Sequence, residues 1–241
     1  IKVKICKKID KNIEEEIKKI KPDLIISSYY RKILSKAIWS ASKIISINIH
    51  PSLLPFYRGP IPTAWALLNR EKYTGVTIHK INEKIDSGDI LFQKRFKIGR
   101  FETGYELHIK SMNKGISLFK KNFNRLINNK IKLYKQQLGG SYYGPKNDFE
   151  FINWKQKSED IESFVRMRAY PFNIAQTTLY NKYFFINSVK ILNNKFLIQK
   201  PGIILKVNND GSFNVSTSNG SLLVKDYTVV PKFQNIKEKK L

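Results

Sequence analysis

The sequence contains almost no cysteine and very little histidine. Its 241 residues include one cysteine, Cys6, and three histidines. A single cysteine cannot form an internal disulfide, which fits a reducing cytoplasm. No cluster of Cys and His has the spacing of a zinc site, so no metal site is predicted.

Long hydrophobic runs are also lacking. No apolar run approaches the roughly 18 to 20 residues that a bilayer span requires, and no signal peptide is recognisable. The chain begins at Ile1 rather than Met, which leaves a processed or incomplete N-terminus open. Hydrophobic residues make up 41% of the chain, enough to build a core. A globular cytoplasmic protein without a membrane partner is predicted.

Acidic residues are scarce, since 19 Asp and Glu stand against 44 Lys and Arg, for a formal net charge of +25. The excess is spread along the chain, with 30 basic and 13 acidic residues in 1–150 and 14 and 6 in 151–241. An even excess is typical of a solvated basic surface, and it can also attract an anionic substrate. Charge alone therefore does not predict a nucleic-acid site.

The first half of the chain alternates helical and strand patterns. Helices are predicted over 10–20, 35–41, 63–69 and 102–127, and strands over 1–5, 24–27, 44–49 and 75–81. The longest helix, with Thr103 as its N-cap, has an apolar stripe predicted to pack on a sheet. The stripe consists of Leu107, Met112, Ile116, Phe119, Phe123 and Leu126. Strands that alternate with helices favour a parallel sheet covered on both faces.

A polar, glycine-bearing stretch at 132–149 is predicted to link a first domain, 1–131, to a second, 150–241. In the second domain Ser158 is predicted to cap a short helix that buries Ile161, Phe164 and Val165. The remainder is β-rich, with hairpin turns at 208–211 and 218–220 where Asn or Asp precedes Gly. A small antiparallel sheet or barrel is the natural prediction.

The most unusual cluster of residues is the run from Asn48 to Pro60. Asn48 and His50 stand at i and i+2 at the end of an apolar strand, so their side chains leave the same face of the sheet. Ligands of open α/β sheets bind just beyond the carboxyl ends of strands. Asn can donate a hydrogen bond to an oxygen that becomes negative, and a neutral His can exchange a proton near pH 7.

A carboxylate that holds the imidazole would complete such a site. Asp86 is the candidate, because it lies in a turn soon after the strand that contains His79. Taken singly, each of these residues is more often structural than catalytic. We expect His79 to be a buried, satisfied histidine rather than a catalytic one.

The run NIHPSLLPFYRGPIPTAWALLN, followed by TGVTIHKINEKIDSGDIL, resembles the central signature of the folate-dependent formyltransferase family. The resemblance is strong over residues 21–93 and looser over 100–175. It implies an α/β fold, with a Rossmann-like formyltransferase domain followed by a small β-rich domain, for which an OB-like form is one option. It also implies that Asn48, His50 and Asp86 correspond to the family's catalytic Asn, His and Asp.

The resemblance further implies a formyl donor, 10-formyltetrahydrofolate, and no metal. The turn Ser52–Pro55 and the loop 28–35 would border its pocket. The residues predicted to bind this cosubstrate are Ser52, Leu53, Leu54, Pro55 and Ile33. Those predicted to contact the acceptor are Tyr57, Arg58, Tyr142 and Tyr143, with structural roles left open for all four.

The acceptor amine remains open. The run from Ser141 into the second domain looks more like the sugar N-formyltransferases, which act on nucleotide-linked amino sugars such as dTDP sugars for surface polysaccharide (lipopolysaccharide, O-antigen). Dimers are common among those enzymes, so a homodimer is an expectation. Methionyl-tRNA formyltransferase, which acts on initiator tRNA, is the first alternative. A degenerate, non-catalytic binding module is the second.

The chain departs from the family pattern at its start. Family members begin with further strand and helix before the matching region, which starts almost at Ile1 here. The resemblance therefore predicts that one or two βα units are absent, each βαβ unit being about 30 residues long. Substrate and cosubstrate sites would then be incomplete.

Overall fold

The computed structural model describes residues 9–144, 150–179, 181–192 and 200–231, which form two compact units. The first unit draws its residues from Ile1–Thr63, Tyr73–Lys97 and Ile109–Pro145, and the second from Ala64–Lys72, Ile98–His108 and Lys146–Leu241. The strand predicted over 1–5 lies outside the described residues. Within the described residues, no helix is long and apolar enough to cross a lipid bilayer.

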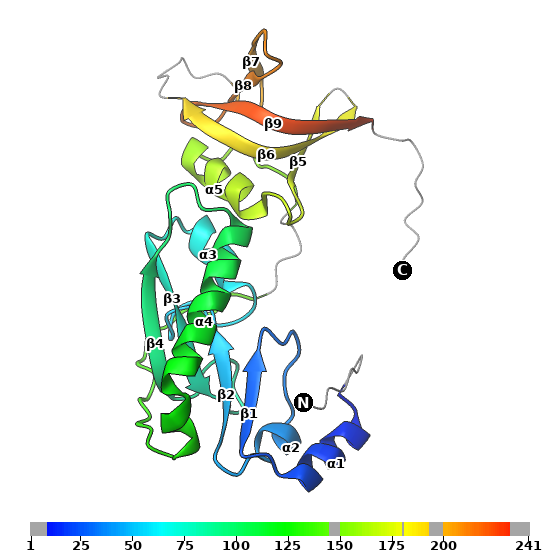
Figure 1. Ribbon diagram of the computed structural model, residues 1–241. Helices are drawn as coiled ribbons and strands as arrows, with labels where there is room; N and C mark the ends of the chain where they lie inside the picture. Colours follow the sequence, from blue (N-terminus) through cyan, green and yellow to red (C-terminus); the bar gives the residue numbers. More distant parts are fainter. Residues whose placement is uncertain (1–8, 145–149, 180, 193–199, 232–241) are drawn as a thin grey trace. The chain divides into compact units, whose positions relative to one another are not determined.

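The first unit is built on a four-stranded mixed sheet in the order β1-β2-β3-β4 (Figure 1). The strands are β1 Leu24–Ser28, β2 Ile45–His50, β3 Tyr73–Lys80 and β4 Ile90–Lys97. Only β1 and β2 are parallel, whereas β2–β3 and β3–β4 are antiparallel. The sheet, predicted to be parallel, is therefore mixed, because the segment between β3 and β4 is a short turn that can only join antiparallel neighbours.

The predicted helices of the first half are present. They are α1 Lys11–Ile20, α2 Lys36–Trp39, α3 Pro62–Leu68 and α4 Gly104–Ile127. Asp10 caps α1 by accepting from the Ile13 amide at 3.0 Å. The predicted cap of α4 is confirmed, since Thr103 Oγ1 accepts from the Glu106 amide while Glu106 Oε2 accepts from the Thr103 amide. This reciprocal pair is a capping box.

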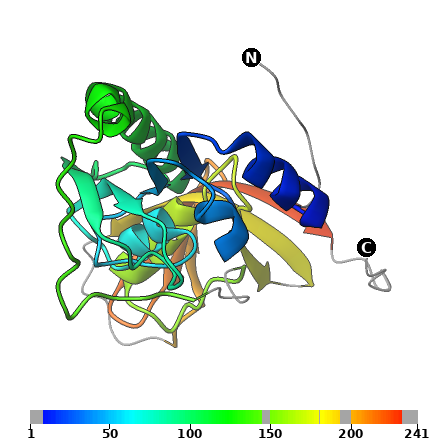
Figure 2. The same ribbon diagram turned by 90° about the horizontal axis from the view of Figure 1, so that it is seen from below.

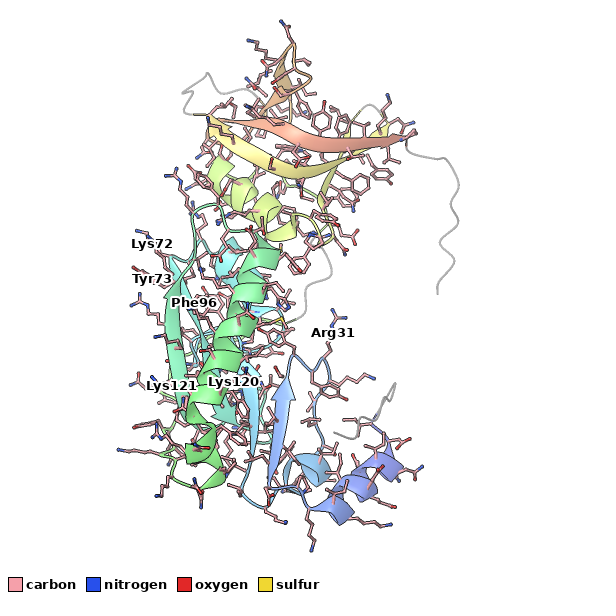
Figure 3. The ribbon with its side chains drawn as sticks, viewed as in Figure 1. Arg31, Lys72, Tyr73, Phe96, Lys120 and Lys121 are labelled. Atoms are coloured by element: carbon pink, nitrogen blue, oxygen red, sulfur yellow. The ribbon has the colours of Figure 1, made fainter. Side chains whose placement is uncertain are left out.

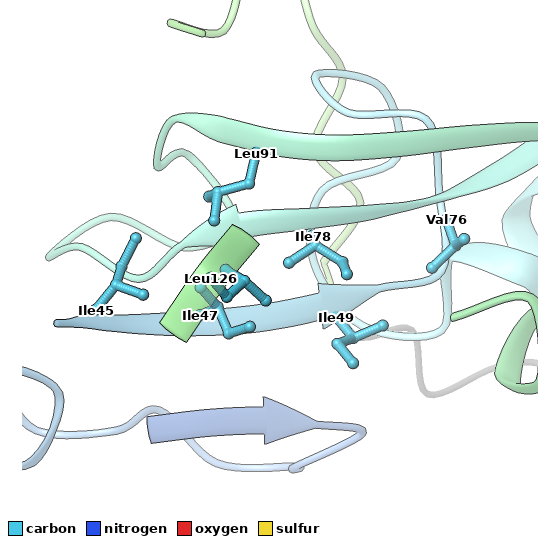
Figure 4. Packing of buried hydrophobic residues seen from close by; sticks show 7 residues of the cluster. All are labelled: Ile45, Ile47, Ile49, Val76, Ile78, Leu91 and Leu126. Carbon is cyan, nitrogen blue, oxygen red and sulfur yellow. The ribbon is translucent and has the colours of Figure 1, made fainter. Parts of the chain in front are cut away.

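One face of the sheet forms the core of the first unit together with α4 (Figures 1 and 2). Because side chains alternate along a strand, the isoleucines of β2 all point to this face. Figure 4 shows the cluster, which consists of Ile45, Ile47, Ile49, Val76, Ile78, Leu91 and Leu126. The polar residues of β2, Ser46, Asn48 and His50, consequently point to the opposite face.

The predicted apolar stripe of α4 is only partly buried. Ile116 and Phe123 are 47% and 40% exposed, whereas Ser111 and Asn122 are buried in their place. Gly115 meets the sheet so closely that an added Cβ would lie 2.9 Å from Ile49 Cγ2. Small residues are therefore what allow α4 to approach β2, and the exposed side of the helix carries lysines such as Lys120 and Lys121 (Figure 3).

The second unit contains a five-stranded antiparallel sheet in the order β5-β6-β9-β8-β7, with α5 packed against β6 (Figure 1). Its elements are α5 Ser158–Arg168, β5 Ala175–Leu179, β6 Lys182–Leu192, β7 Ile204–Val207, β8 Phe213–Ser216 and β9 Ser221–Pro231. Both predicted hairpin turns are confirmed, at 208–211 and at 218–220.

The helix α5 buries Ile161, Phe164 and Val165 as predicted. Ser158, however, is the first helical residue, and Lys157 occupies the N-cap position without a side-chain hydrogen bond. The Ser158 hydroxyl instead lies 2.7 Å from Thr217 Oγ1. The predicted cap is therefore wrong, because this hydroxyl bonds to the β8–β9 turn rather than to its own helix.

Candidate active site

The polar face of the sheet brings together the three residues that the sequence singles out. Asn48 and His50 end β2, and Asp86 comes from the turn between β3 and β4. Asp86 Oδ1 accepts from Asn48 Nδ2 at 3.3 Å, and Asp86 Oδ2 lies 3.5 Å from His50 Nδ1. The predicted convergence of an amide, an imidazole and a carboxylate is present in the structure.

The position of Asp86 is held by a backbone amide and by a side-chain amide. Its Oδ2 accepts from the Gly59 amide at 2.9 Å. Gln136 Nε2 donates to the carbonyl oxygens of Asp86 and Gly88, both at 2.8 Å. Asp86 itself has φ +48°, in the left-handed region that Asp tolerates better than most residues. The turn is thus held by Gln136, a residue of the predicted linker.

The proton on His50 can be located from its neighbours. His50 Nε2 lies 2.8 Å from the Tyr57 carbonyl oxygen, which can only accept, so Nε2 carries a hydrogen. In the neutral ring the lone pair is therefore on Nδ1, facing Asp86. Burial lowers the pKa of His50, and its neighbour His79 lowers it further, although the Asp86 charge and the Tyr57 carbonyl oppose the shift. The resting imidazole is neutral at pH 7.

Asp86 remains ionised in this setting. Burial raises the pKa of its carboxyl, but His79 and His50 in their protonated forms, together with the Gly59 amide, outweigh burial and lower the pKa. A neutral imidazole beside an ionised carboxylate is an arrangement that can accept a proton and stabilise the resulting cation.

His79 belongs to the same cluster. It is 2% exposed, and its Nε2 lies 3.2 Å from Asn48 Nδ2 and 3.4 Å from Asp86 Oδ1. The expectation that it is buried and hydrogen-bonded is met, but its partners are the candidate catalytic residues. The signal that could have placed it there is its position at the end of β3, the strand that leads into the Asp86 turn, directly opposite Asn48 in the β2–β3 pairing.

The predicted cosubstrate-binding turn is engaged within the fold. The hydroxyl of Ser52 donates to the Phe56 carbonyl at 2.7 Å, and the Leu54 amide donates to Thr77 Oγ1 at 3.2 Å. Both side chains are buried, whereas those of Leu53 and Pro55 are partly exposed. Ile33 is 77% exposed. Ligand contact by these residues stays a prediction, and the geometry gives Ser52 and Leu54 a structural role.

The predicted acceptor-binding residues lie on two adjoining segments. The Arg58 amide donates to the Ser141 carbonyl at 2.9 Å, and the Tyr143 amide donates to the Arg58 carbonyl at 2.9 Å. The rings of Tyr57 and Tyr143 are stacked, with centroids 5.3 Å apart, while Tyr142 is 53% exposed. The part of the predicted linker at 141–143 is therefore hydrogen-bonded to the segment that follows β2.

A cavity of about 650 Å³ lies beside the Asp86 turn. Its lining residues include Trp39, Arg58, Asn82, Lys84, Ser87 and Gln136. Two buried atoms in this lining, Arg58 Nε and Gln136 Oε1, have no hydrogen-bond partner. One is a donor and the other an acceptor, so a ligand that offers both kinds of group can satisfy them. Within the described part of the chain, no three His, Cys, Asp or Glu are grouped to hold a metal ion.

Comparisons with known proteins identify the family of this chain. A family model described as formyl transferase matches residues 3–121, and one described as formyl transferase, C-terminal domain, matches 145–231. Methionyl-tRNA formyltransferase of Clostridium tetani is 37% identical over 218 residues, which cover 90% of this chain and 69% of that relative.

Two solved structures are also similar. One is the N-formyltransferase from Helicobacter canadensis in complex with folinic acid and dTDP-3-aminofucose (TM-score 0.68, 26% identity, 84% of this chain and 73% of that one). The other is WlaRD, a sugar 3N-formyl transferase, in the presence of dTDP and 5-N-formyl-THF (TM-score 0.67, 28% identity, 87% and 75%). The chain therefore belongs to the formyl transferase family.

Proposed function

We propose that this chain transfers a formyl group from 10-formyltetrahydrofolate to the amino group of a dTDP-linked amino sugar. The observation that carries the proposal is the contact of Asn48, His50 and Asp86 beside a cavity with unsatisfied polar atoms. The product would be a formamido sugar for surface polysaccharide such as O-antigen.

The reaction requires one group that accepts a proton and one that donates a hydrogen bond to the oxyanion. The amine nitrogen attacks the formyl carbon, and the carbonyl oxygen becomes negative. The carbon–nitrogen bond to the folate then breaks, and the proton lost by the amine ends on the folate nitrogen. Atoms and charges balance without a redox step.

His50 and Asp86 are suited to carry that proton. The lone pair of neutral His50 is on Nδ1, 3.5 Å from Asp86 Oδ2, so a proton that arrives there forms an imidazolium next to a carboxylate. Asp86 is the more exposed of the two side chains, at 13% against 6%. We infer that the proton passes between the ligand and His50 by way of the Asp86 side of the pair.

Asn48 is the candidate donor to the oxyanion. Both of its amide hydrogens have acceptors, Asp86 and His79, and the Nε2 hydrogen of His50 is held by Tyr57. An N–H of Asn48 must therefore exchange its present acceptor for the substrate oxygen. Removing one donor of this kind typically lowers the rate by about 100- to 1000-fold.

The cavity beside Asp86 is suited to the pterin of the formyl donor. A pterin has N–H donors for Gln136 Oε1 and a carbonyl and ring nitrogens for Arg58 Nε, the two orphaned atoms of the lining. Trp39 offers an aromatic surface for the flat ring. The lining also includes Ser87, which follows Asp86 in the sequence. A donor bound in this cavity would therefore have its formyl group close to the carboxylate of Asp86.

The amino-sugar assignment is supported by the two solved relatives, of which one is a complex with dTDP-3-aminofucose and the other is a sugar 3N-formyl transferase in the presence of dTDP. Tyr142 is the side chain most available to stack on a nucleobase, because Tyr143 already stacks on Tyr57. Such stacking contributes roughly 1 to 3 kcal/mol per base.

Initiator tRNA is the second candidate acceptor. It is favoured by the 37% identity to methionyl-tRNA formyltransferase and by the formal net charge of +25. Backbone phosphates bind such a basic surface by charge.

A paired assay tests the proposal. The protein is incubated with 10-formyltetrahydrofolate and either a dTDP-linked amino sugar or methionyl initiator tRNA, and formylated product is measured by mass spectrometry. We expect formylation of the sugar in the wild type and a loss of at least about 100-fold in His50→Asn.

The other outcomes are equally distinct. Formylation of the tRNA alone would overturn the sugar assignment and leave the chemistry standing. Unchanged turnover in His50→Asn would overturn the mechanism. Binding of the folate without turnover on either acceptor would indicate a non-catalytic binding module.

A further inference from the structure

We propose that His79 is a positioning residue, which anchors the amide of Asn48 so that one of its hydrogens is presented to the reacting oxygen. The proposal rests on the proposed function and deepens it. Residues directly opposite each other in an antiparallel pair have side chains on the same face, about 4.5 to 5.5 Å apart at Cβ. Asn48 of β2 and His79 of β3 are such a pair.

The tautomer of His79 follows from a backbone contact. Its Nδ1 lies 2.9 Å from the Lys80 carbonyl oxygen, which can only accept. Nδ1 therefore carries a hydrogen, and in the neutral ring Nε2 presents a lone pair. That lone pair faces Asn48 Nδ2 at 3.2 Å, which is a good distance for a hydrogen bond from an amide.

The orientation of the Asn48 amide then has one solution. Its nitrogen is placed between two acceptors, His79 Nε2 and Asp86 Oδ1. Turning the amide over would put Oδ1 of Asn48 against a carboxylate oxygen and a lone pair, with no hydrogen between any of them. The cluster therefore selects the rotamer that points the NH₂ group toward Asp86.

The two amide hydrogens are not equivalent. His79 is 2% exposed, its ring is fixed by Lys80, and Asn48 supplies the hydrogen for its lone pair. When Asn48 leaves Oδ1 of Asp86, the other carboxylate oxygen, Oδ2, still accepts from the Gly59 amide at 2.9 Å. The longer 3.3 Å bond to Asp86 is thus the one that can be exchanged for the formyl oxygen, while the bond to His79 holds the amide in place.

Two substitutions at position 79 test this role in the full chain. His79→Phe keeps the ring volume and removes the acceptor, whereas His79→Gln places a carboxamide oxygen within reach of Asn48. We expect His79→Phe to lower kcat by up to about 100-fold with KM for both substrates changed less than twofold, because the donor is misplaced rather than lost. We expect His79→Gln to recover at least tenfold of that loss.

A double substitution separates positioning from a structural role. If His79 acts through Asn48, His79→Phe has no further effect on kcat in the Asn48→Ala background. Losses that multiply in the double variant, or a His79→Gln variant as slow as His79→Phe, overturn the proposal.

A spectroscopic readout keeps the proposal independent of turnover. The side-chain amide signals of Asn48, identified by their absence in Asn48→Ala, are followed by ¹H–¹⁵N NMR. We expect them to shift in His79→Phe and to return toward the wild-type position in His79→Gln. Unchanged signals in His79→Phe overturn the anchoring even if the enzyme is active. Absent turnover in the wild type with shifted signals overturns only the proposed function.

Discussion

At the scale of single residues, the buried pair of His50 and Asp86 is the proposed proton acceptor of the site. The Nδ1 lone pair of His50 faces the carboxylate of Asp86, whose pKa is lowered. The negative charge of Asp86 raises the pKa of His50 above that of an isolated buried imidazole. Burial nevertheless dominates, and the pKa of His50 stays below its ordinary value. A base of this kind works from neutral pH upward and loses activity in acid.

Asp86→Asn tests the electrostatic part of this account. In the wild type the acidic limb of kcat is expected below pH 6.5, because the pKa of His50 is lowered. The charge of Asp86 raises that pKa, so its removal should move the limb to still lower pH. It should also reduce kcat by about 100-fold or more, because the imidazolium loses its counter-ion. The measurement is a pH profile under saturating substrates.

The matched control is Asp23→Asn, which removes an exposed carboxylate that pairs with Lys43 at 3.4 Å and does not line the cavity. Its acidic limb should coincide with that of the wild type. An acidic limb that rises in Asp86→Asn would contradict the assignment of the limb to His50.

Single residues were partly predictable from the sequence. The i and i+2 spacing of Asn48 and His50 fixes a shared face, which needs only the period of a strand. The tautomer of His50 depends on the Tyr57 carbonyl, and the capture of Asp86 depends on the Gly59 amide. Backbone partners of this kind come from loop geometry, which no spacing in the sequence reveals.

At the scale of elements, the turn that carries Asp86 is the most consequential. Gln136 should matter because its amide nitrogen holds two carbonyls of that turn. We expect Gln136→Ala to lower kcat by about tenfold, since the carboxylate is no longer fixed. Gln136→Glu should be worse, because a carboxylate would repel both carbonyls. Steady-state kinetics check both variants.

The neighbouring exposed Lys135 supplies the control. Lys135→Ala should leave kcat within twofold of the wild type. Equal activities for all three variants would show that the turn holds its shape without the clamp.

The approach of α4 to β2 yields a stability prediction. Gly115→Val adds side-chain atoms where Ile49 Cγ2 and Val76 Cγ2 already lie 2.9 and 3.4 Å from the position of a Cβ. We expect it to lower the free energy of unfolding by about 1 to 3 kcal/mol through overpacking. The midpoint of urea denaturation measures the effect.

Ile116→Ala, on the exposed side of the same helix, is the comparison. It should change the free energy of unfolding by about 0.5 kcal/mol or less. A Gly115→Val variant as stable as the wild type would show that α4 can withdraw from the sheet at no cost.

The bounds of the helices were predicted better than the pairing of the strands. The helices α1, α3 and α4 lie within two residues of their predicted bounds, since their apolar spacing and caps are local features. The sheet was mispredicted as parallel, although β2 alternates isoleucine with polar residues, a pattern typical of a half-polar antiparallel strand. The predicted stripe of α4 is only partly buried, because Gly115 is the residue that meets the sheet, and Ser111 and Asn122 are buried while Ile116 and Phe123 are exposed.

At the scale of the whole molecule, the charge is the dominant feature. A formal net charge of +25 should draw a pyrophosphate-linked substrate to the site. We expect kcat/KM for the dTDP sugar to fall severalfold when the KCl concentration rises from about 50 to 200 mM, with kcat unchanged. A neutral amine acceptor, formylated slowly, is the control and should show no such fall.

The domain layout also belongs to this scale. The predicted boundaries at 131 and 150 stay a prediction, because the second compact unit also contains two short segments from the first half of the sequence, 64–72 and 98–108. Composition marks polar stretches, but it cannot show which unit a short segment joins. The part of the predicted linker at 141–143 is fixed by backbone hydrogen bonds to Arg58.

The pairing of β2 with β3 has a practical consequence. Sliding one strand by a single residue would turn the isoleucines of β2 outward and bury Asn48 and His50 among aliphatic side chains. The same ladder therefore assembles the hydrophobic interior and the reactive cluster. Turnover can therefore report native strand alignment. Molecules with a shifted register should have no activity rather than a reduced kcat.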